Sequence, residues 1–385
     1  MKKNLLLIAG EVSGDLHAAE VLKALKISSP DLSVWGIGGD QLEAEGMRLL
    51  EHTDKMAVMG LVEVLRHYRF FKSTFQRVLD EVDRRKPAAA LLVDYPGFNL
   101  RLAEALKEKG IPVFYYISPK VWAWNKKRIP KMAQSIDHLM VVFPFELSFF
   151  EDSGLSVDFV GNPLVAQIDQ FLNTKWDRLP WKASPCVALL PGSRKQEIER
   201  ILPPMLAAAR ILQKTFPNIS FIIPAPNARM QKLVEKHVEK SIDKPTWLEI
   251  TQNNAREVLR QAEVGIVASG TATLEAALLG IPHILVYKTS PLTYWLARTM
   301  IKITHLGLAN IIAKRTIVPE LIQHAATPEA LAKETTLLLE NGNKRHTMLE
   351  DFKEIRALLG EKNAAQQVAQ FLTQALSAPN TKEKD

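Results

Sequence analysis

Short apolar runs alternate with segments of helical periodicity along almost the whole chain. Because these runs are brief and little interrupted by polar residues, they are typical of parallel strands that are buried on both faces. The alternation of strands with helices predicts an α/β fold with parallel sheets. Strands are expected near Leu5–Ala9, Val34–Ile37, Ala89–Val93, Val113–Ile117, Leu139–Val142, Phe159–Val160, Val187–Leu190, Ser220–Ile223, Trp247–Ile250, Gly265–Ala268 and Ile284–Tyr287. Helices are expected, among other places, at Asp15–Leu25, Leu100–Lys109, Ile198–Lys214 and Ala228–Glu239.

The length of the chain points to two domains. A chain of 385 residues exceeds what one hydrophobic core comfortably organises. The segment Asn173–Pro185 is polar, contains proline and lacks periodicity, so it is the best candidate for a linker. Strand–helix alternation begins again after it. We therefore expect one α/β domain over 1–172 and a second over 186–349.

Composition narrows the class of protein and the kind of partner. Hydrophobic residues make up 47% of the chain and charged residues 24%, which is typical of a soluble globular protein. The single cysteine, Cys186, lies in an apolar run, so a disulfide framework is excluded and a core position is expected. A net charge of +7 favours anionic partners such as phosphorylated substrates, nucleic acid or a membrane surface. Since the apolar run after Met1–Asn4 has only the length of a strand, we expect neither a signal peptide nor a transmembrane helix.

One turn between a predicted strand and helix has the features of an anion site. The run Val264–Ala268 ends at Ser269-Gly270-Thr271, and the helix that follows carries Glu275. The first N–H groups of a helix have no intrahelical partners and its dipole is positive there, so a diphosphate fits. Glu275 lies one turn further on, where a carboxylate can accept hydrogen bonds from sugar hydroxyls. A plain strand–helix connection capped by Ser or Thr explains the same residues equally well.

Two more strand–helix loops combine glycine with polar residues. Leu5–Ala9 leads into Gly10-Glu11-Val12-Ser13-Gly14-Asp15, and Val187–Leu190 leads into Pro191-Gly192-Ser193-Arg194. Neither loop matches the dinucleotide fingerprint or the P-loop, which disfavours dehydrogenases and ATPases. Arg194 can offer a planar fork of donors to a phosphate. Alternatively, Arg194 is an ordinary surface residue. A cation is disfavoured at a helix N-terminus, however, and this mismatch favours the role in binding a phosphate.

Asp94 is the candidate general base. It directly follows the apolar run Ala89–Val93 and therefore lies at the carboxyl end of a predicted strand. Partial desolvation there would raise its pKa towards a value that is useful for proton abstraction. An aspartate that holds the following Pro-Gly turn through backbone N–H groups is an equally good interpretation.

The loop Ser118–Arg128 places Trp122 and Trp124 beside four basic side chains. Aromatic surfaces with cations suit a sugar, an acyl chain or a nucleobase. Two half-buried tryptophans that anchor a loop are the alternative. Because the basic residues are local rather than spread along a groove, nucleic acid is not the expected partner. The histidines show no metal-ligand spacing, so no metal is expected.

The segment Val58–Leu79 has an apolar face at helical spacing. Val62 and Phe70 fall outside that face, and arginine and lysine side chains flank it. An apolar surface with a basic rim is typical of helices that bind a membrane interface. A helix that is buried in the core explains the same periodicity.

Taken together, these motifs match one family. The chain resembles the lipid-A-disaccharide synthases, which are glycosyltransferases with the two-domain GT-B fold. The resemblance rests on motifs that run in the family's order over nearly the whole chain: Ala9-Gly10-Glu11-Val12-Ser13-Gly14-Asp15, Ala57-Val58-Met59-Gly60-Leu61-Val62-Glu63-Val64, Asp94 with Phe98-Asn99, Ser118-Pro119 with Val121-Trp122-Ala123-Trp124, Leu190-Pro191-Gly192-Ser193-Arg194, Ser269-Gly270-Thr271-Ala272-Thr273-Leu274-Glu275, and Asn310.

The resemblance implies a reaction and an architecture. A 2,3-diacylglucosamine unit would pass from UDP-2,3-diacylglucosamine to 2,3-diacylglucosamine 1-phosphate, giving the β-1,6-linked lipid A disaccharide 1-phosphate and UDP. The transfer would be inverting and would need no metal or other cofactor. Two Rossmann-like domains would face a cleft, and helices from about residue 350 would return to the N-terminal domain.

The resemblance also implies roles for individual residues. Asp94 matches the proposed base. The donor's diphosphate would be bound by Gly192, Ser193 and Arg194 together with Ser269, Gly270 and Thr271, its ribose by Glu275 and its nucleotide side by Asn310. Glu11, Ser13, Trp122 and Trp124 would border the acceptor side.

Acylated substrates imply a membrane surface. Val62, Leu65, Phe70 and Phe71 would contact the cytoplasmic face of the inner membrane, so we expect a cytoplasmic protein that is peripherally associated with it. The oligomeric state stays open, and a homodimer is compatible with the sequence. A UDP-amino-sugar epimerase of the same fold and a non-catalytic protein that binds lipids or nucleotide sugars are the alternative functions.

Overall fold

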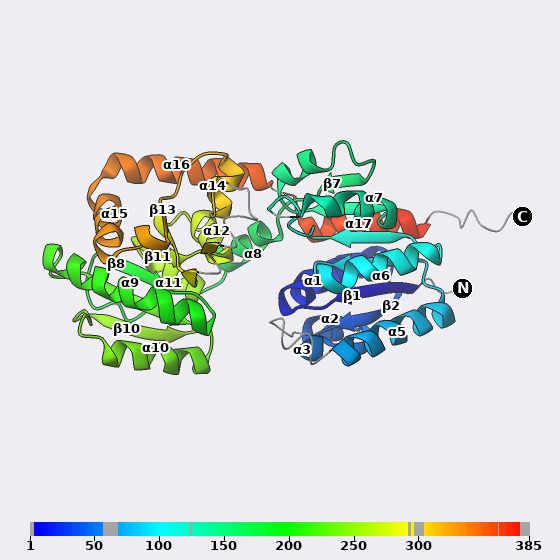
Figure 1. Cartoon of the computed structure of the whole chain (residues 1–385), viewed down its shortest axis with the longest axis horizontal. Helices are drawn as coiled ribbons and strands as arrows, with labels where there is room; N and C mark the ends of the chain where they lie inside the picture. The colour runs from blue at the N-terminus through cyan, green and yellow to red at the C-terminus, as the bar shows by residue number, and fades with distance from the viewer. Residues whose placement is uncertain are drawn as a thin grey trace, which may run out of the picture. The chain divides into compact units, whose positions relative to one another are not determined.

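Each of two units of the chain is built on one parallel sheet (Figure 1). The computed structural model describes residues 4–56, 68–123, 125–291, 294–295, 304–360 and 362–377. Unit 1 comprises Met1–Pro163 and Leu359–Asp385, and unit 2 comprises Leu164–Leu358. The prediction of an α/β fold with two Rossmann-like domains is confirmed.

Unit 1 holds a seven-stranded sheet in the order β3-β2-β1-β4-β5-β6-β7, with parallel strand pairs throughout. Its strands are β1 (Asn4–Ala9), β2 (Ser33–Gly38), β3 (Arg48–His52), β4 (Ala89–Val93), β5 (Val113–Tyr116), β6 (His138–Val141) and β7 (Ser156–Phe159). Its helices are α1 (Val12–Ser28), α2 (Asp40–Ala44), α3 (Thr53–Met56), α5 (Tyr68–Arg85), α6 (Pro96–Glu108), α7 (Ile129–Ser135) and α17 (Ala364–Ser377), with short 3-10 turns η1 (Lys126–Arg128) and η2 (Pro144–Phe149).

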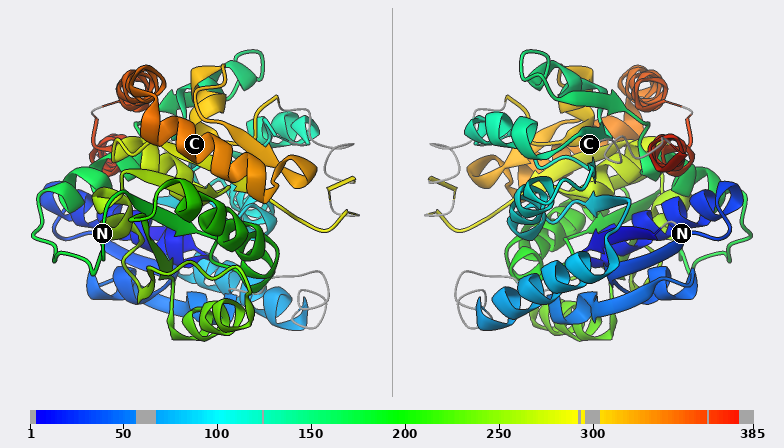
Figure 2. Two further views of the ribbon diagram at one scale, coloured as in Figure 1. Left: turned by 90° about the vertical axis from the view of Figure 1, so that its left-hand side faces the viewer. Right: turned by 90° about the vertical axis from the view of Figure 1, so that its right-hand side faces the viewer.

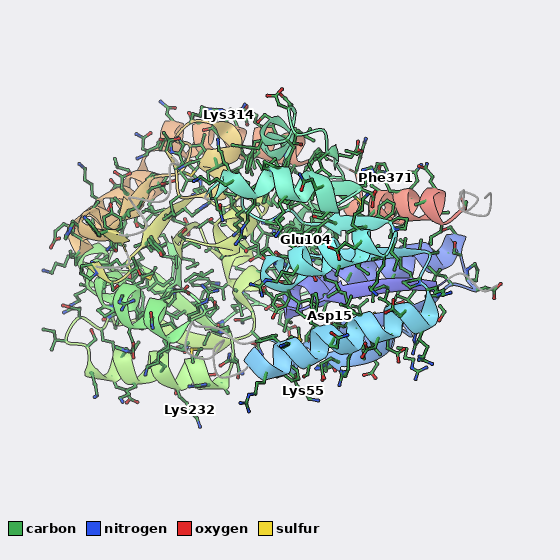
Figure 3. The ribbon with its side chains drawn as sticks, turned by 45° about the vertical axis from the view of Figure 1, so that its right-hand side comes forward. Asp15, Lys55, Glu104, Lys232, Lys314 and Phe371 are labelled. Atoms are coloured by element: carbon green, nitrogen blue, oxygen red, sulfur yellow. The ribbon has the colours of Figure 1, made fainter. Side chains whose placement is uncertain are left out.

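Both faces of this sheet are buried, which explains the unbroken apolar runs. Leu5 and Leu7 of β1 point into a core with α1 and α17, whereas Leu6 and Ile8 point into the opposite core with α5, α6 and α7. Figure 2 shows α17 lying beside α1, although the two helices are far apart in the sequence. The ring of Phe371 of α17, which is labelled in Figure 3, packs on the His138 ring with centroids 4.5 Å apart. The last helix therefore returns to the N-terminal unit.

Unit 2 holds a six-stranded sheet in the order β10-β9-β8-β11-β12-β13, again with parallel pairs. Its strands are β8 (Cys186–Leu190), β9 (Ser220–Ala225), β10 (Leu248–Gln252), β11 (Val264–Ala268), β12 (His283–Tyr287) and β13 (Glu320–Ile322). Its helices are α8 (Pro163–Leu172), α9 (Lys195–Thr215), α10 (Ala228–Lys240), α11 (Ala255–Gln261), α12 (Thr271–Leu278), α14 (Leu308–Ala313), α15 (Pro328–Glu340) and α16 (Gly342–Leu359), with the 3-10 turn η3 (Gln323–Ala325).

The segment that the sequence marks as a linker belongs to unit 2. Residues 173–185 are irregular, as expected, but side chains of the following elements hold them. Gln261 Oε1 accepts from the Leu179 backbone N–H at 3.0 Å, and Ser184 Oγ donates to Glu263 Oε1 at 2.8 Å. The division between the units falls at 163/164 and 358/359 instead. Sequence periodicity could not show this, because the ties are side-chain hydrogen bonds across about eighty residues.

Helix α8 is likewise joined to unit 2. Gln167 Oε1 accepts from Arg256 Nη2 at 3.1 Å, and Asp169 forms an ion pair with Arg356. The expected N-terminal domain ended at 172, beyond this helix, whereas these contacts explain why 164–172 cluster with the second unit.

Two strands were absent from the sequence-based prediction. Both β3 and β13 lie at a sheet edge and carry polar residues, so neither forms an apolar run. In β3 the buried Glu51 carboxylate is paired with Lys55 and Arg77, each at 3.0 Å. A strand at the edge of a sheet has only one neighbouring strand and can carry polar residues, so a search for apolar runs does not detect it.

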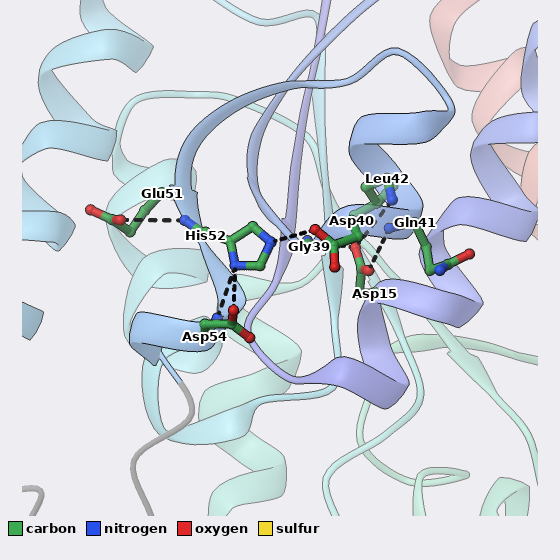
Figure 4. Close-up of polar contacts among 8 residues, drawn as sticks. All are labelled: Asp15, Gly39, Asp40, Gln41, Leu42, Glu51, His52 and Asp54. Atoms are coloured by element: carbon green, nitrogen blue, oxygen red, sulfur yellow. Dashed lines mark hydrogen bonds and ion pairs between the residues drawn. The ribbon is translucent and has the colours of Figure 1, made fainter. Parts of the chain in front are cut away.

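The last residue of the Gly10–Asp15 motif has a structural role (Figure 4). The Asp15 carboxylate is buried and accepts hydrogen bonds from the backbone N–H groups of Gly39 (2.6 Å), Gln41 (3.0 Å) and Leu42 (3.3 Å). It therefore caps the N-terminus of α2 from a different helix and fixes the start of α1 against the β2–α2 turn. A side chain at Gly39 would lie 2.8 Å from Asp15 Oδ2, so the turn requires glycine there.

We predict that Asp15→Ala lowers the free energy of unfolding by roughly 1–3 kcal/mol, because three buried N–H groups lose their acceptor. Urea denaturation followed by circular dichroism measures this. Asp40→Ala is the matched control, since Asp40 is 88% exposed and pairs only with His52 at the surface (Figure 4). Equal loss of stability in the two variants would contradict the capping role.

Candidate functional site

The chemistry-bearing residues of unit 1 gather at one edge of its sheet. Because β1, β4 and β5 are parallel neighbours, their carboxyl ends meet at the same edge. Glu11 follows β1, Asp94 follows β4 and the loop from Ser118 follows β5. Ligands of open α/β sheets bind at this edge.

The chain leaves β4 through an unusual turn. Asp94 and Tyr95 both adopt the left-handed region, with φ of +46° and +48°, which costs a non-glycine residue about 1–2 kcal/mol. The buried Asn99 side chain donates to the Asp94 carbonyl at 2.8 Å and to the Val93 carbonyl at 3.2 Å. Tyr115 Oη also donates to the Asp94 carbonyl, at 2.6 Å. These hydrogen bonds hold the Asp94 backbone and leave its carboxylate for other contacts.

Tyr95 explains the glycine that follows β1. A Cβ atom at Gly10 would overlap the Tyr95 ring, so only glycine allows this packing. The Tyr95 hydroxyl donates to the Met56 carbonyl at 3.0 Å, which fixes the ring. The turn at Gly10 and the turn at Asp94 therefore pack directly against each other.

The pKa of the Asp94 carboxyl lies near neutral pH. Burial, as the largest cause, and the negative charge of Glu11 together raise this pKa to about 6. The Lys120 ammonium and a hydrogen bond from the Tyr95 backbone N–H act against this rise. Part of the Asp94 side chain stays accessible, so a substrate hydroxyl can reach it.

Glu11 and Ser13 are both exposed at the start of α1. Glu11 is the N-cap residue of α1, but its side chain does not cap the helix. Its carboxylate is instead within electrostatic range of Asp94. Glu11 and Asp94 therefore lie at the same edge of the sheet.

The tryptophan loop is anchored in the core. Trp122 is 9% exposed and meets the Phe145 ring edge-on, with centroids 5.1 Å apart. Trp124 lies outside the described residues. The described tryptophan thus fits the anchoring alternative as well as a ligand contact.

Sequence reasoning missed a second carboxyl group at this edge. Glu146 is buried, accepts from the Phe143 backbone N–H at 3.1 Å, and burial raises its pKa to about 8. The only sequence signal is one carboxylate in the otherwise apolar stretch 143–150. A carboxyl group with this pKa is largely neutral at pH 7.

In unit 2 the loop after β8 is organised by a carboxylate. Glu197 Oε2 accepts from the backbone N–H groups of Ser193 (3.0 Å) and Arg194 (3.2 Å), and Glu197 Oε1 pairs with Arg194 Nη1 at 3.2 Å. Gly192 has φ of +108°, and a Cβ there would lie 2.5 Å from Glu197 Oε2. The Arg194 side chain remains 65% exposed. The loop is therefore preformed around an anionic group, which sequence reasoning did not identify.

The turn after β11 presents an open helix start. Gly270 is the N-cap of α12 and has φ of +158°, and no side chain among the described residues caps this helix. Gly270 and Thr271 are exposed and Ser269 is half-buried. The Thr273 N–H donates to the Gly270 carbonyl at 3.3 Å, whereas no side chain in the described part of the chain caps the start of α12, as an anion site at a helix N-terminus requires.

Glu275 is held by an arginine that the sequence did not suggest. Arg256 of α11 donates to Glu275 Oε1 from Nε at 2.9 Å and from Nη2 at 2.7 Å. Within the described part of the chain, no residue donates to Glu275 Oε2. The carboxylate is therefore oriented through one oxygen, and the other can accept from a ligand. Nothing in the sequence links Arg256 to Glu275, because they lie on different helices.

Asn310 has a different environment from the one expected. It is fully buried and its side chain is saturated, since Oδ1 accepts from the backbone N–H groups of Ile317 (2.8 Å) and Val318 (2.9 Å). Its Nδ2 donates to the Val318 carbonyl at 2.8 Å and to Glu320 Oε1 at 2.7 Å. These contacts argue against direct binding of a nucleotide by the Asn310 side chain. They support a role in holding the segment before β13.

The residues expected at a membrane divide into two groups. Val62 and Leu65 lie outside the described residues. Phe70 and Phe71 of α5 are half-buried and pack against the core on the α5 side of the sheet, with their rings edge-to-face at 5.8 Å. Arg69 and Lys72 next to them are exposed. The basic rim is therefore present on the described part of α5, whereas the two phenylalanines also serve the core.

Across the described part of the chain, no helix is long and apolar enough to cross a membrane. Among the same residues, no group of three or more His, Cys, Asp or Glu side chains is arranged to hold a metal ion.

The architecture is similar to that of a solved glycotransferase and a solved epimerase. The glycotransferase of kitacinnamycin superimposes with a TM-score of 0.64 at 13% identity, over 97% of this chain and 98% of that chain. A UDP-GlcNAc 2-epimerase from Neisseria meningitidis, bound to UDP-GlcNAc, gives a TM-score of 0.60 at 13% identity, over 97% and 99%. At this level of identity the likeness concerns the GT-B fold alone.

The relatives found by sequence similarity identify the family of the chain. Lipid-A-disaccharide synthase from Myxococcus xanthus is 39% identical over 375 residues, which is 97% of both chains. The lipid-A-disaccharide synthase from Syntrophus aciditrophicus is 39% identical over 371 residues, 95% of this chain and 96% of that protein. The model of the lipid-A-disaccharide synthetase family matches residues 5–373. The chain belongs to the lipid-A-disaccharide synthetase family.

Proposed function

We propose that this protein transfers 2,3-diacylglucosamine from its UDP derivative to the 6-hydroxyl of 2,3-diacylglucosamine 1-phosphate. The products are the β-1,6-linked disaccharide 1-phosphate and UDP. Family membership supports lipid A disaccharide synthesis as the activity. The observation that carries the mechanism is the Asp94 carboxyl, held on a fixed turn with a pKa of about 6.

In this mechanism unit 1 binds the acceptor. The Asp94 carboxylate takes the proton of the 6-hydroxyl while that oxygen attacks the anomeric carbon of the donor. The bond from this carbon to the diphosphate oxygen breaks, and the electron pair leaves with UDP. A single in-line displacement of this kind inverts the anomeric configuration.

Unit 2 binds the donor in this proposal. The leaving diphosphate gains negative charge in the transition state, and donors that are already fixed stabilise it best. Arg194 and the N–H groups at the start of α12 are such donors. Glu275 accepts from the ribose hydroxyls, since Arg256 holds its carboxylate by one oxygen. Helix N-termini and an arginine can supply this charge without a metal ion.

The alternative functions make different demands on the same residues. An epimerase of this fold would need the UDP-sugar site of unit 2 but no lipid acceptor. A non-catalytic binding protein would need no base. An epimerase could also use Asp94 as a base, so we favour the transferase because of the family to which the chain belongs.

Asp94→Asn should lower kcat by roughly 100-fold to 10,000-fold, because the amide cannot accept the acceptor proton. In the unsubstituted enzyme kcat/KM should rise as the pH rises through about 6, since the base acts in its deprotonated form. The measurement is UDP release from UDP-diacylglucosamine, with and without the lipid phosphate acceptor, from pH 5 to 8.

Calorimetric UDP binding should be unchanged in Asp94→Asn, which separates loss of catalysis from loss of fold. Asp80→Asn, an exposed carboxylate on α5, is the matched control and should behave as the unsubstituted enzyme. Retained turnover in Asp94→Asn would refute the base assignment. Conversion of the UDP-sugar into its epimer, without an acceptor and without UDP release, would favour the epimerase.

Glu275→Ala should weaken UDP binding about tenfold, which corresponds to one lost hydrogen bond to a charged group. Isothermal calorimetry with UDP measures the effect, and the melting temperature reports whether Arg256 tolerates the loss of its partner. Glu239→Ala, an exposed carboxylate on α10, is the control. Unchanged affinity would mean that the turn after β11 is only a scaffold.

We also propose that the segment from Val58 to Leu79 docks the protein on the anionic cytoplasmic face of the inner membrane. Its apolar pattern, with basic side chains at Arg69 and Lys72, supports this. Acylated substrates provide the reason for such a surface.

The double variant Val62→Ser/Leu65→Ser should lower partition into vesicles that contain anionic lipid by roughly tenfold or more, because two apolar side chains are lost. Vesicle sedimentation measures it, and thermal melting should be unchanged. Phe70 and Phe71 are unsuitable targets, since both pack on the core. Ile242→Ser in unit 2, where the side chain is 97% exposed, is the control. Equal partition of the double variant and the control into the vesicles would contradict the docking proposal.

A further inference from the structure

Lys120 is displayed on a rigid loop at the edge of the sheet that carries Asp94. Its neighbours Pro119 and Val121 are buried, whereas Lys120 itself is exposed. The Pro119 carbonyl accepts from the Val121 backbone N–H at 2.6 Å and from Ser118 Oγ at 3.0 Å. The Lys120 carbonyl accepts from the Ala123 backbone N–H at 3.1 Å. The backbone is thus fixed, and only the lysine side chain extends from it.

The Lys120 ammonium is available for a ligand. Among the described residues, none forms an ion pair with it. Strand β5 pairs with β4, so Lys120, which follows β5, leaves the same edge of the sheet as Asp94. Its positive charge also favours the ionised form of Asp94. Other cations of the same loop are placed differently, since Lys126 Nζ lies over the Phe149 ring at 4.7 Å and Arg128 has partners of its own.

A phosphate at this edge of the sheet would need a cation beside it. Glu11 and Asp94 put two carboxyl groups at the edge where the acceptor would bind. A phosphate monoester carries roughly two negative charges at neutral pH and would be repelled there without a nearby cation. An exposed, fixed lysine supplies that cation.

The chemistry of the acceptor fits the same place. In a glucosamine 1-phosphate, C1 and C5 are both bonded to the ring oxygen, so the phosphate and the 6-hydroxyl flank this oxygen. A sugar whose 6-hydroxyl meets Asp94 can therefore direct its phosphate to a cation at the same edge of the sheet. The motif through which the chain resembles its family skips position 120, so the resemblance gave this lysine no role.

We propose that Lys120 binds the phosphate monoester of the acceptor sugar and selects phosphorylated acceptors, while it orients the 6-hydroxyl towards Asp94. This inference rests on the proposed transferase function and adds a specificity-determining residue to it.

Lys120→Gln tests the proposal in neutral detergent micelles, with 2,3-diacylglucosamine 1-phosphate and with 2,3-diacylglucosamine that lacks the phosphate. The KM for the phosphorylated acceptor should rise roughly tenfold to a hundredfold, and the KM for the other acceptor should stay the same. Lys120→Arg should retain most of the selectivity, because it keeps the charge. Lys127→Gln, an exposed lysine on the same loop, is the matched control and should change neither KM.

Three results would overturn the proposal. If both acceptors lose activity equally, Lys120 acts only through the charge state of Asp94. If selectivity is unchanged, the lysine does not contact the phosphate. If the defect is seen only on vesicles that contain anionic phospholipid, the lysine binds lipid head groups instead of the acceptor. Failure of the proposed function is distinct from all three, since the unsubstituted enzyme would then release no UDP in response to either acceptor.

Discussion

Burial of both faces of the parallel strands is the constraint on which the chemistry of unit 1 depends. Because β1, β4 and β5 are covered on both sides, polar groups can be placed only where these strands end. The parallel direction brings those ends to one edge. Helix α17, from the far end of the sequence, completes the cover over β1 and α1.

The way the chain leaves β4 converts this edge into a site. A left-handed backbone at Asp94 and Tyr95 is costly, and it persists because Asn99 and Tyr115 donate to the Asp94 carbonyl. This backbone places the Tyr95 ring in the space that is left by the missing side chain of Gly10. A fixed carboxylate loses little conformational freedom when it meets a hydroxyl, and partial burial gives it the basicity to take a proton.

In unit 2, ion pairs fix the positions of the candidate site residues. Glu197 organises the loop that carries Arg194, and Arg256 orients Glu275. In both cases one charged side chain positions another, and the second is the one that we propose binds the donor. The site residues are therefore preformed by interactions between neighbouring elements, in keeping with a reaction in which charge develops on a leaving diphosphate.

The sequence alone determined the fold class, because apolar runs and helical periods are local patterns. It also located Asp94, Glu11, Arg194 and Glu275, since each follows an apolar run or lies in a short motif. Only the tertiary structure decided what these residues touch. It joined residues 173–185 to unit 2, saturated Asn310 with backbone hydrogen bonds, and brought Arg256 to Glu275. Burial and hydrogen bonding between distant elements leave no periodic trace in a sequence, and for that reason the environment of Lys120 emerged only from the folded chain.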